Sequence, residues 1–476
     1  MNDRMTDSPP PRLWDAPPGR WARGKLRELW GIDLRSLALL RIGLGASVLA
    51  DVAMRAFDLV GLYTDRGVLP RALVLAMDGP GVYLSAHYWA SANPLLQGAL
   101  FATTACCAVA LLAGWRTRLA TLACWYLVAS VQIRQPLGYM GGDSILRLLL
   151  FWGLFLPLGA RFSLDETRGR VQPRPDPFVS GATVAVLLQV CLIYWATGIR
   201  KTGELWWSGQ ALFYALHQDE YATALGVRLR DYPSLLEPMT YGTLGLELFG
   251  PFLAFVPIYT GAFRIATVAV FWAFHAGLAA TMNIGLFPLF SMVAWLPFVP
   301  TQAWTWGGWP TSSAAERPFD WRSRLTSMAA CICLVYVIVL LAERARVIPR
   351  VLPTQLTAIG TALRLQQTWN MFAPDPPTMT SRFEIRKTMW DGSHVTEPAP
   401  TTFRWTVYLG RTSIPRPVDD PLTQSFRRFA HQRCASTGLD DARRVQRIAI
   451  LAHQRKIDRQ MPTGPMTHTL VDIQCE

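Results

Sequence analysis

Charged residues are scarce in this chain of 476 residues, of which only 17% are Asp, Glu, Lys or Arg. Soluble globular domains carry a charge on about a quarter of their residues. Apolar residues make up 51% of the chain and come in long blocks, which argues against a wholly soluble protein. The 19 tryptophans and 22 phenylalanines suit a protein that is anchored at two membrane interfaces. The composition therefore predicts a polytopic membrane protein.

Acidic residues are fewer than basic residues: the chain has 33 Asp and Glu and 46 Lys and Arg, which gives a net charge of +13. In a membrane protein such an excess reflects topology and contact with anionic lipid head groups. No DNA- or RNA-binding motif accompanies it. We therefore expect membrane lipids, and not nucleic acid, as partners.

Cysteines are few and include no Cys-x-x-Cys motif. Six of the eight lie within apolar runs, where a thiol behaves as a small hydrophobic side chain. The other two, Cys434 and Cys475, lie in the polar C-terminal region and are candidates for a disulfide if that region is extracytoplasmic. We expect no metal site.

A cleavable signal peptide is also missing, because residues 1–30 are rich in Pro and Arg and contain no apolar core. This segment reads as a basic flexible tail, and the first membrane helix must itself direct insertion. About eight or nine transmembrane helices are predicted from the apolar runs near residues 37–54, 96–113, 119–133, 140–157, 184–196, 241–258, 263–282, 284–298 and 327–341.

The fold class that follows is an all-α polytopic membrane bundle with a small C-terminal extramembrane α+β domain. We place the bundle at residues 31–300, a linker at 301–325, an additional transmembrane helix at 326–343 and the C-terminal domain at 344–476. Alternating apolar and polar residues predict strands in that last domain.

Within the C-terminal domain the predicted elements are strands at 382–388, 403–409 and 467–474 and a basic helix at about 421–459. Asp391-Gly392 has the composition of a hairpin turn after the first strand.

The orientation follows from the Lys and Arg residues of the loops. With the spans given above, 17 Lys and Arg residues lie in the tail and loops on the side of the N-terminus, and 8 lie in the loops on the other side. We expect an integral protein of a bacterial inner membrane with a cytoplasmic N-terminus. An odd number of spans then makes the C-terminal domain extracytoplasmic.

Several charges fall inside the predicted spans. Arg41 and Asp51 share the first helix but are ten residues apart, or about 15 Å, which is too far for a mutual salt bridge. Each needs a partner elsewhere in the protein, so this helix is a bundle member. Glu247 lies at membrane depth, where a lone carboxylate is costly, and should be paired or protonated.

Two further polar residues have both a structural and a functional interpretation. Asp143 or Ser144 suits a helix N-cap, and Asp143 lies four residues before Arg147, so that an ion pair on one helix face is expected. Alternatively, it belongs to a polar group that lines a site. His275 is either a hydrogen-bonded histidine of the core or a site residue.

The stretch from Ile193 to Gly209 is the strongest candidate for chemistry. An apolar run leads directly into Arg200-Lys201, and Trp206 and Trp207 follow. A lysine at the end of a membrane helix often extends its amine to water and does nothing else. Burial under tryptophans would instead lower its pKa and make it a base near neutral pH. Both interpretations remain open from these residues alone.

Five motifs in one order resemble a known family. They are Phe57-Asp58 with Tyr63-Thr-Asp-Arg-Gly67, Gly141-Gly-Asp-Ser with Leu156-Pro-Leu-Gly, Tyr194…Lys201-x4-Trp206-x2-Gly209, Asn283-Ile-Gly-Leu-Phe287-Pro, and Trp369-Asn-Met-Phe372-Ala-Pro374. Over about residues 30–300 the chain is similar to the horizontally transferred transmembrane (HTTM) family. Its membrane domain is shared with vitamin K-dependent γ-glutamyl carboxylase.

The resemblance implies catalytic roles for Lys201, Asp143 and His275. In the carboxylase a lysine in the matching motif deprotonates reduced vitamin K, whose oxygenated product then removes a proton from a substrate glutamate before CO2 is added. The implied cofactor here is a reduced quinone of the vitamin K or menaquinol type. Trp206, Trp207, Arg41 and Glu247 are the residues that we expect to bind it, and a peptide or lipophilic substrate is expected at the outer face.

The chain departs from that family at one position, because Asp143 stands where the carboxylase has a site histidine. An ionised carboxylate cannot donate the hydrogen bond that an imidazole would. Three hypotheses follow: a carboxylase-like enzyme with Lys201 as base, a lipid- or quinone-binding protein without such chemistry, and a transporter that uses Arg41, Asp51 and Glu247. The transporter is the weakest, since no internal repeat is visible.

Overall fold

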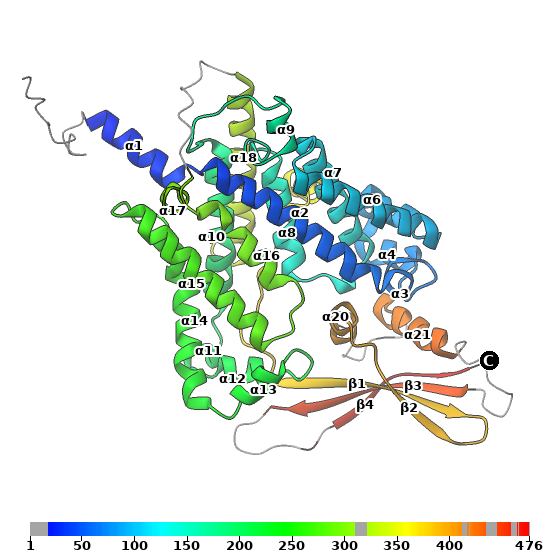
Figure 1. The fold of residues 1–476 in the computed structure, drawn as a ribbon. Helices are drawn as coiled ribbons and strands as arrows, with labels where there is room; N and C mark the ends of the chain where they lie inside the picture. The colour runs from blue at the N-terminus through cyan, green and yellow to red at the C-terminus, as the bar shows by residue number, and fades with distance from the viewer. Residues whose placement is uncertain are drawn as a thin grey trace, which may run out of the picture.

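The computed structural model describes residues 18–309, 321–411, 417, 419–434, 445–457, 464 and 466–475. Parts of the predicted N-terminal tail, linker and basic helix lie outside these described residues, namely residues 1–17, 310–320, 435–444 and 458–463. A body of helices stands over one four-stranded sheet (Figure 1).

Within the described residues, five helices are long and apolar enough to cross a membrane. They are α2 (Leu34–Ala56), α6 (Pro94–Ala113), α10 (Gly181–Arg200), α15 (Thr260–Thr281) and α18 (Trp321–Arg344). Each coincides with a predicted apolar run, and α18 is the additional helix expected at 326–343. Further spans beyond these five stay a prediction.

The other helices of the bundle are shorter or less apolar. They are α7 (Thr117–Arg134), α8 (Gly141–Gly153), α14 (Pro233–Leu253) and α16 (Phe287–Ala294). Short helices connect them: α1 (Pro18–Trp30), α3 (Leu59–Tyr63), α4 (Arg71–Asp78), α5 (Ala86–Ala90), α9 (Leu164–Thr167), α11 (Glu204–Trp207), α12 (Ala211–Leu216), α13 (Ala224–Leu229), α17 (Thr301–Trp306), α19 (Thr354–Ala362) and the 3-10 helices η2 (Gly79–Leu84), η3 (Pro136–Gly138) and η4 (Leu296–Phe298).

The centre of the bundle lies at α8, whose residues from Gly142 to Gly153 are all buried. A helix that is buried on every side needs neighbours on every side, and α2, α7, α10 and α16 supply them. Gly45 allows α6 to approach α2, because a Cβ atom at this position would lie 2.8 Å from the Leu112 backbone nitrogen.

The sheet is antiparallel throughout, with strand order β2-β1-β3-β4. Its strands are β1 (Met379–Met389), β2 (His394–Pro398), β3 (Val445–Lys456) and β4 (Met466–Gln474). Along β1, alternate residues such as Ile385 and Met389 are buried, as expected for a sheet with one covered face. The Asp391-Gly392 turn joins β1 to β2, and Gly392 adopts a φ of 79° there.

Helices α20 (Phe403–Arg411) and α21 (Pro421–Cys434) lie between the sheet and the bundle (Figure 1). Their buried side chains, including Tyr408 and Phe429, share one apolar core with Ile450 of the sheet and with Leu62 and Val131 of the bundle. The C-terminal domain is therefore packed onto the membrane helices through a continuous core.

Two predictions in this domain are wrong. Residues 403–409 form α20 and not a strand. Both faces of this segment are buried, so the alternation of apolar and polar side chains did not indicate a strand with one buried face. Thr402 accepts a hydrogen bond from the Trp405 backbone nitrogen at 3.4 Å and so marks the start of the helix. The described part of the predicted basic helix is α21, up to Cys434, whereas residues 445–456, where the sequence predicts its continuation, form the strand β3. The strands predicted at 382–388 and 467–474 are present as parts of β1 and β4.

Candidate functional site

Lys201 follows the last residue of α10, and its side chain is only 3% exposed. Its Nζ atom donates a hydrogen bond to Glu247 Oε2 at 2.5 Å and lies 4.2 Å from the ring centroid of Trp206. The amine is thus covered by protein and does not extend to the surface. Burial lowers the pKa of Lys201, and the Glu247 carboxylate opposes that shift.

Helix α14 brings Glu247 to this position because it packs closely on α10. Gly198 is three residues before Lys201, and a Cβ atom there would lie 2.8 Å from the Leu248 side chain. A larger residue would force the Leu248 side chain to shift. The expectation that Glu247 has a partner at membrane depth thus corresponds to an observed pair with Lys201.

The cover over Lys201 comes from a distant part of the chain. The indole nitrogen of Trp206 donates to the Phe372 carbonyl at 2.8 Å, and the Gly203 nitrogen donates to the Pro374 carbonyl at 3.1 Å. The end of the Trp369…Pro374 motif, from Phe372 to Pro374, therefore forms the wall beside the lysine loop. Sequence reasoning used this motif only for the family resemblance and assigned it no place in the site. Trp207, by contrast, is 63% exposed.

His275, on α15, lies in a second buried group with Tyr194, which is seven residues or about two helical turns before Lys201 on α10. Its Nε2 atom is 2.8 Å from the Tyr194 hydroxyl, and Trp295 donates its indole N–H to that same hydroxyl at 2.8 Å. The Tyr194 oxygen accepts a hydrogen bond from Trp295. Its hydroxyl proton is then available to be donated to His275 Nε2. We therefore assign the imidazole proton to Nδ1. Among the described residues, this Nδ1 atom has no hydrogen-bond partner.

Asp143 belongs to a separate network of four buried charges. It accepts from Arg55 at 2.5 Å and from Arg404 at 2.7 Å, and both arginines also bind Asp51, at 2.7 and 2.9 Å. The Met140 backbone nitrogen donates to it as well, at 2.7 Å. Two carboxylates and two guanidinium groups thus neutralise each other at the interface of α2, α8 and α20.

The expected pair between Asp143 and Arg147 is wrong. Arg147 instead donates to the Gln132 side chain at 2.6 Å and to the carbonyls of Arg364 and Gln366. The reason is that Arg55 and Arg404 already occupy both oxygens of Asp143. The one sequence signal for Arg404 is its position between Phe403 and Trp405 in an otherwise apolar segment, which is where a buried cation would lie.

Arg41 contacts neither group. Its guanidinium donates to the carbonyls of Arg161 and Phe162, at 3.4 and 2.6 Å, and so holds the loop that follows α8. Lys201, Trp206 and Glu247 are thus brought together, His275 lies beside Tyr194, and Asp143 is held by arginines.

Cys434 and Cys475 are joined by a disulfide, with 5.5 Å between their Cα atoms.

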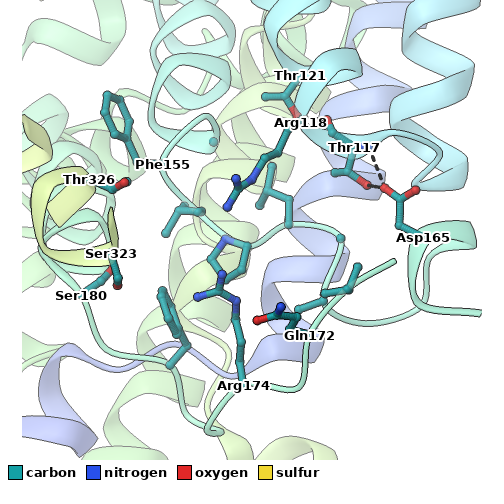
Figure 2. A pocket seen from close by; sticks show the side chains of 18 of the residues that line it. Thr117, Arg118, Thr121, Phe155, Asp165, Gln172, Arg174, Ser180, Ser323 and Thr326 are labelled. Carbon is teal, nitrogen blue, oxygen red and sulfur yellow. Dashed lines mark hydrogen bonds between the residues drawn. The ribbon is translucent and has the colours of Figure 1, made fainter. Parts of the chain in front are cut away.

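A cavity of about 710 Å³ lies far from Lys201 (Figure 2). Ser180, which caps the start of α10, lines it, whereas Lys201 follows the end of that helix about 30 Å away. Among the described residues, no group of three or more His, Cys, Asp or Glu side chains is arranged to hold a metal ion.

Comparison with protein-family models shows that residues 84–304 match the HTTM domain. The matched segment contains Asp143, Lys201, Glu247 and His275, whereas Arg404 and the Phe372 segment lie outside it. No curated protein and no solved structure matches the chain.

Proposed function

Because the chain carries an HTTM domain within an integral membrane bundle, we propose that it is a membrane enzyme of the carboxylase type with Lys201 as its base. The proton that Lys201 accepts would come from a hydroxyl group of a reduced quinone or a similar lipophilic cofactor. One observation carries the proposal, namely that the Lys201 amine is buried and ion-paired where a helix end would leave it in water.

The Lys201–Glu247 pair offers a way to prepare the base. An amine accepts a proton only when it is neutral, and the proton that Nζ donates in its hydrogen bond to Glu247 Oε2 can transfer to that oxygen. In a site without water, the neutral pair of amine and carboxylic acid comes close in energy to the ion pair. Lys201 Nζ then receives the next proton, and Glu247 holds the first.

The buried pair and the second group, at Tyr194 and His275 about two helical turns away along α10, would together suit an amphiphilic ring compound with hydroxyl or carbonyl oxygens. The partnerless Nδ1 of His275 supports this fit, because a buried N–H without an acceptor is costly and a ligand oxygen would satisfy it. Trp206 and the apolar side chains of Phe271 and Trp295 would exclude water. When bound, such a cofactor would supply redox chemistry that protein side chains lack.

The outer domain would present the substrate. It packs against the end of the bundle that holds the Lys201 loop, and its chain contributes the wall at Phe372. We propose a peptide or another lipophilic molecule that approaches from the extracytoplasmic side, in line with the orientation that the loop charges predict.

A second candidate is a protein that binds a quinone or lipid without converting it. The ion pair itself favours this alternative, because Lys201 and Glu247 satisfy each other and the resting protein then holds no free base. Asp143 also has no oxygen left for a ligand, since it accepts from Arg55, Arg404 and the Met140 nitrogen.

The test is to purify the protein in detergent, add menaquinol with oxygen and CO2, and measure both quinol consumption and quinone binding by native mass spectrometry. We expect Lys201→Ala to abolish turnover and retain binding. Arg228→Ala is the matched control, since it removes an exposed cation outside the site. Binding without turnover in the unmodified protein would favour the second candidate, and the absence of both would refute the proposal.

A further inference from the structure

The cavity at the far end of the bundle is lined by basic residues. It lies between the start of α7, the end of α8, the loop after α9 and the start of α18. Arg116, Arg118, Arg170 and Arg174 contribute to its lining, and Asp165 is the one acidic residue among the lining residues that the structure describes. Figure 2 shows Arg118 and Arg174 reaching toward its middle from opposite sides.

The charge of Asp165 is already engaged within the protein. Its two oxygens accept from the backbone nitrogens of Arg116 and Thr117, at 3.0 and 2.8 Å, and from the Thr117 hydroxyl at 2.8 Å. Arg170 is 3.9 Å from it. Asp165 therefore caps the start of α7, and the lining residues that the structure describes include four arginines against this one carboxylate. Such an excess in a concave site attracts an anion.

The polar part of the cavity suits a phosphate group. Hydroxyl-bearing Ser180, Ser323 and Thr326 lie on the wall across from Asp165 (Figure 2), and arginine forks match phosphate oxygens in geometry. Phe155 also contributes to the lining, so that one end of the space is apolar.

Apolar surface continues from the cavity along two helices. Leu119 and Leu122 are exposed on α7, and Leu325 and Met328 are exposed on α18. Helix α18, and helix α6 of the same bundle, are long and apolar enough to span a membrane. The exposed apolar residues beside the cavity would therefore meet acyl chains. A polar cavity beside such a surface has the form of a site for a lipid head group.

We propose that this arginine-lined cavity binds a phosphate-bearing anion, and that an anionic phospholipid of the adjacent leaflet is its main source. The inference is independent of the chemistry proposed at Lys201. The cavity lies on the side of the N-terminus, where the loop charges predict the cytoplasmic face. Anionic lipid head groups are bound by basic pockets between membrane helices on that face.

The experiment uses the full-length protein, purified and stripped of lipid, with phosphatidylglycerol, phosphatidylcholine and inorganic phosphate as probes in native mass spectrometry. We expect phosphatidylglycerol to bind in preference to phosphatidylcholine. The double variant Arg118→Gln/Arg174→Gln should weaken phosphatidylglycerol binding by at least about tenfold. The matched control Arg168→Gln/Arg228→Gln removes two exposed arginines outside the lining and should leave binding unchanged.

Inorganic phosphate distinguishes the two sources of the anion. If millimolar phosphate binds and this binding is lost in the double variant, the site takes a soluble phosphate. If phosphate neither binds nor displaces the lipid, the site takes the lipid. The proposal is overturned if phosphatidylglycerol and phosphatidylcholine bind equally and phosphate does not bind, or if the control variant loses as much binding as the double variant. If the double variant unfolds, phosphatidylglycerol binding is measured on Arg118→Gln alone, which alters an exposed side chain. Weaker binding of this single variant supports the proposal, and unchanged binding overturns it.

Discussion

At the scale of single residues, the position of Lys201 separates its two interpretations. A lysine that only anchors a helix end extends its four-carbon chain to water. Here the chain turns inward to Glu247 and lies under Trp206, so that the ammonium group has lost most of its hydration. Removing water from a charge is costly, and such an arrangement persists only where the partner compensates for it. Much of the stability of this corner of the bundle should therefore depend on the pair as a unit.

A double-mutant cycle tests this dependence. Glu247→Gln leaves a buried amine without its counter-charge, and Lys201→Met leaves a buried carboxylate, so each should lower the free energy of unfolding by roughly 3–5 kcal/mol. The double variant should lose about 1–3 kcal/mol less than the sum of the two. Unfolding in detergent, followed by circular dichroism, gives the values.

The control for this cycle is Glu237→Gln, which neutralises an exposed carboxylate on the same helix and should change stability by no more than about 0.5 kcal/mol. Strict additivity of the two single changes would show that the pair does not act as a unit.

At the scale of helices and strands, close approach between apolar helices depends on small residues at the contact. Gly45 on α2 lies against the backbone of α6, and the gap leaves no room for a methyl group. In a lipid environment the hydrophobic effect does not drive helices together, so van der Waals packing of this kind supplies much of the free energy of helix association.

Gly45→Ala should therefore destabilise the bundle by roughly 1–3 kcal/mol, because the new Cβ atom would meet the backbone at Ala108 and Leu112. Gly98→Ala on α6 is the matched control, since nothing lies within 4 Å of the added atom. It should be neutral or stabilising by up to about 1 kcal/mol. Thermal unfolding of the two variants in one detergent makes the comparison, and equal midpoints would contradict the packing argument.

The elements differ in how far the sequence predicts them. The five long apolar helices follow from their composition alone, because a largely apolar run of that length with few charges has few other uses. The segment that begins at Phe403 does not, since its apolar residues satisfy the period of a strand and one face of a helix equally well. Burial on both sides by the sheet and the bundle decided between them, and only the tertiary fold contains that information.

At the scale of the whole molecule, one network ties the C-terminal domain to the bundle. Arg404 reaches Asp51 and Asp143, which precede it by 353 and 261 residues. The sequence indicates that Asp51 needs a partner, but it does not identify which of the many arginines is that partner. The pairing of Lys201 with Glu247 escapes sequence reasoning for the same reason, although both were candidates for the site.

Replacing Arg404 by Met should separate the domain from the bundle. The variant leaves two buried carboxylates with Arg55 alone, at an expected cost of roughly 3–5 kcal/mol. Limited proteolysis of the purified protein should then release the C-terminal domain at protease concentrations that leave the unmodified protein intact. Arg386→Met on β1 is the control, because that guanidinium is about half exposed. Equal resistance of both variants would refute a docking role for the network.

The position of Arg404 so late in the chain also has a consequence for biogenesis. Asp51, Arg55 and Asp143 leave the ribosome long before it, so the nascent protein carries one uncompensated negative charge between the end of α2 and the start of α8 until translation nears completion. If the domain is secreted as the loop charges predict, the cation must first cross the bilayer and then return to its partners from the far side. Products that stop before residue 404 should therefore reach the membrane, fail to mature and be removed by quality-control proteases.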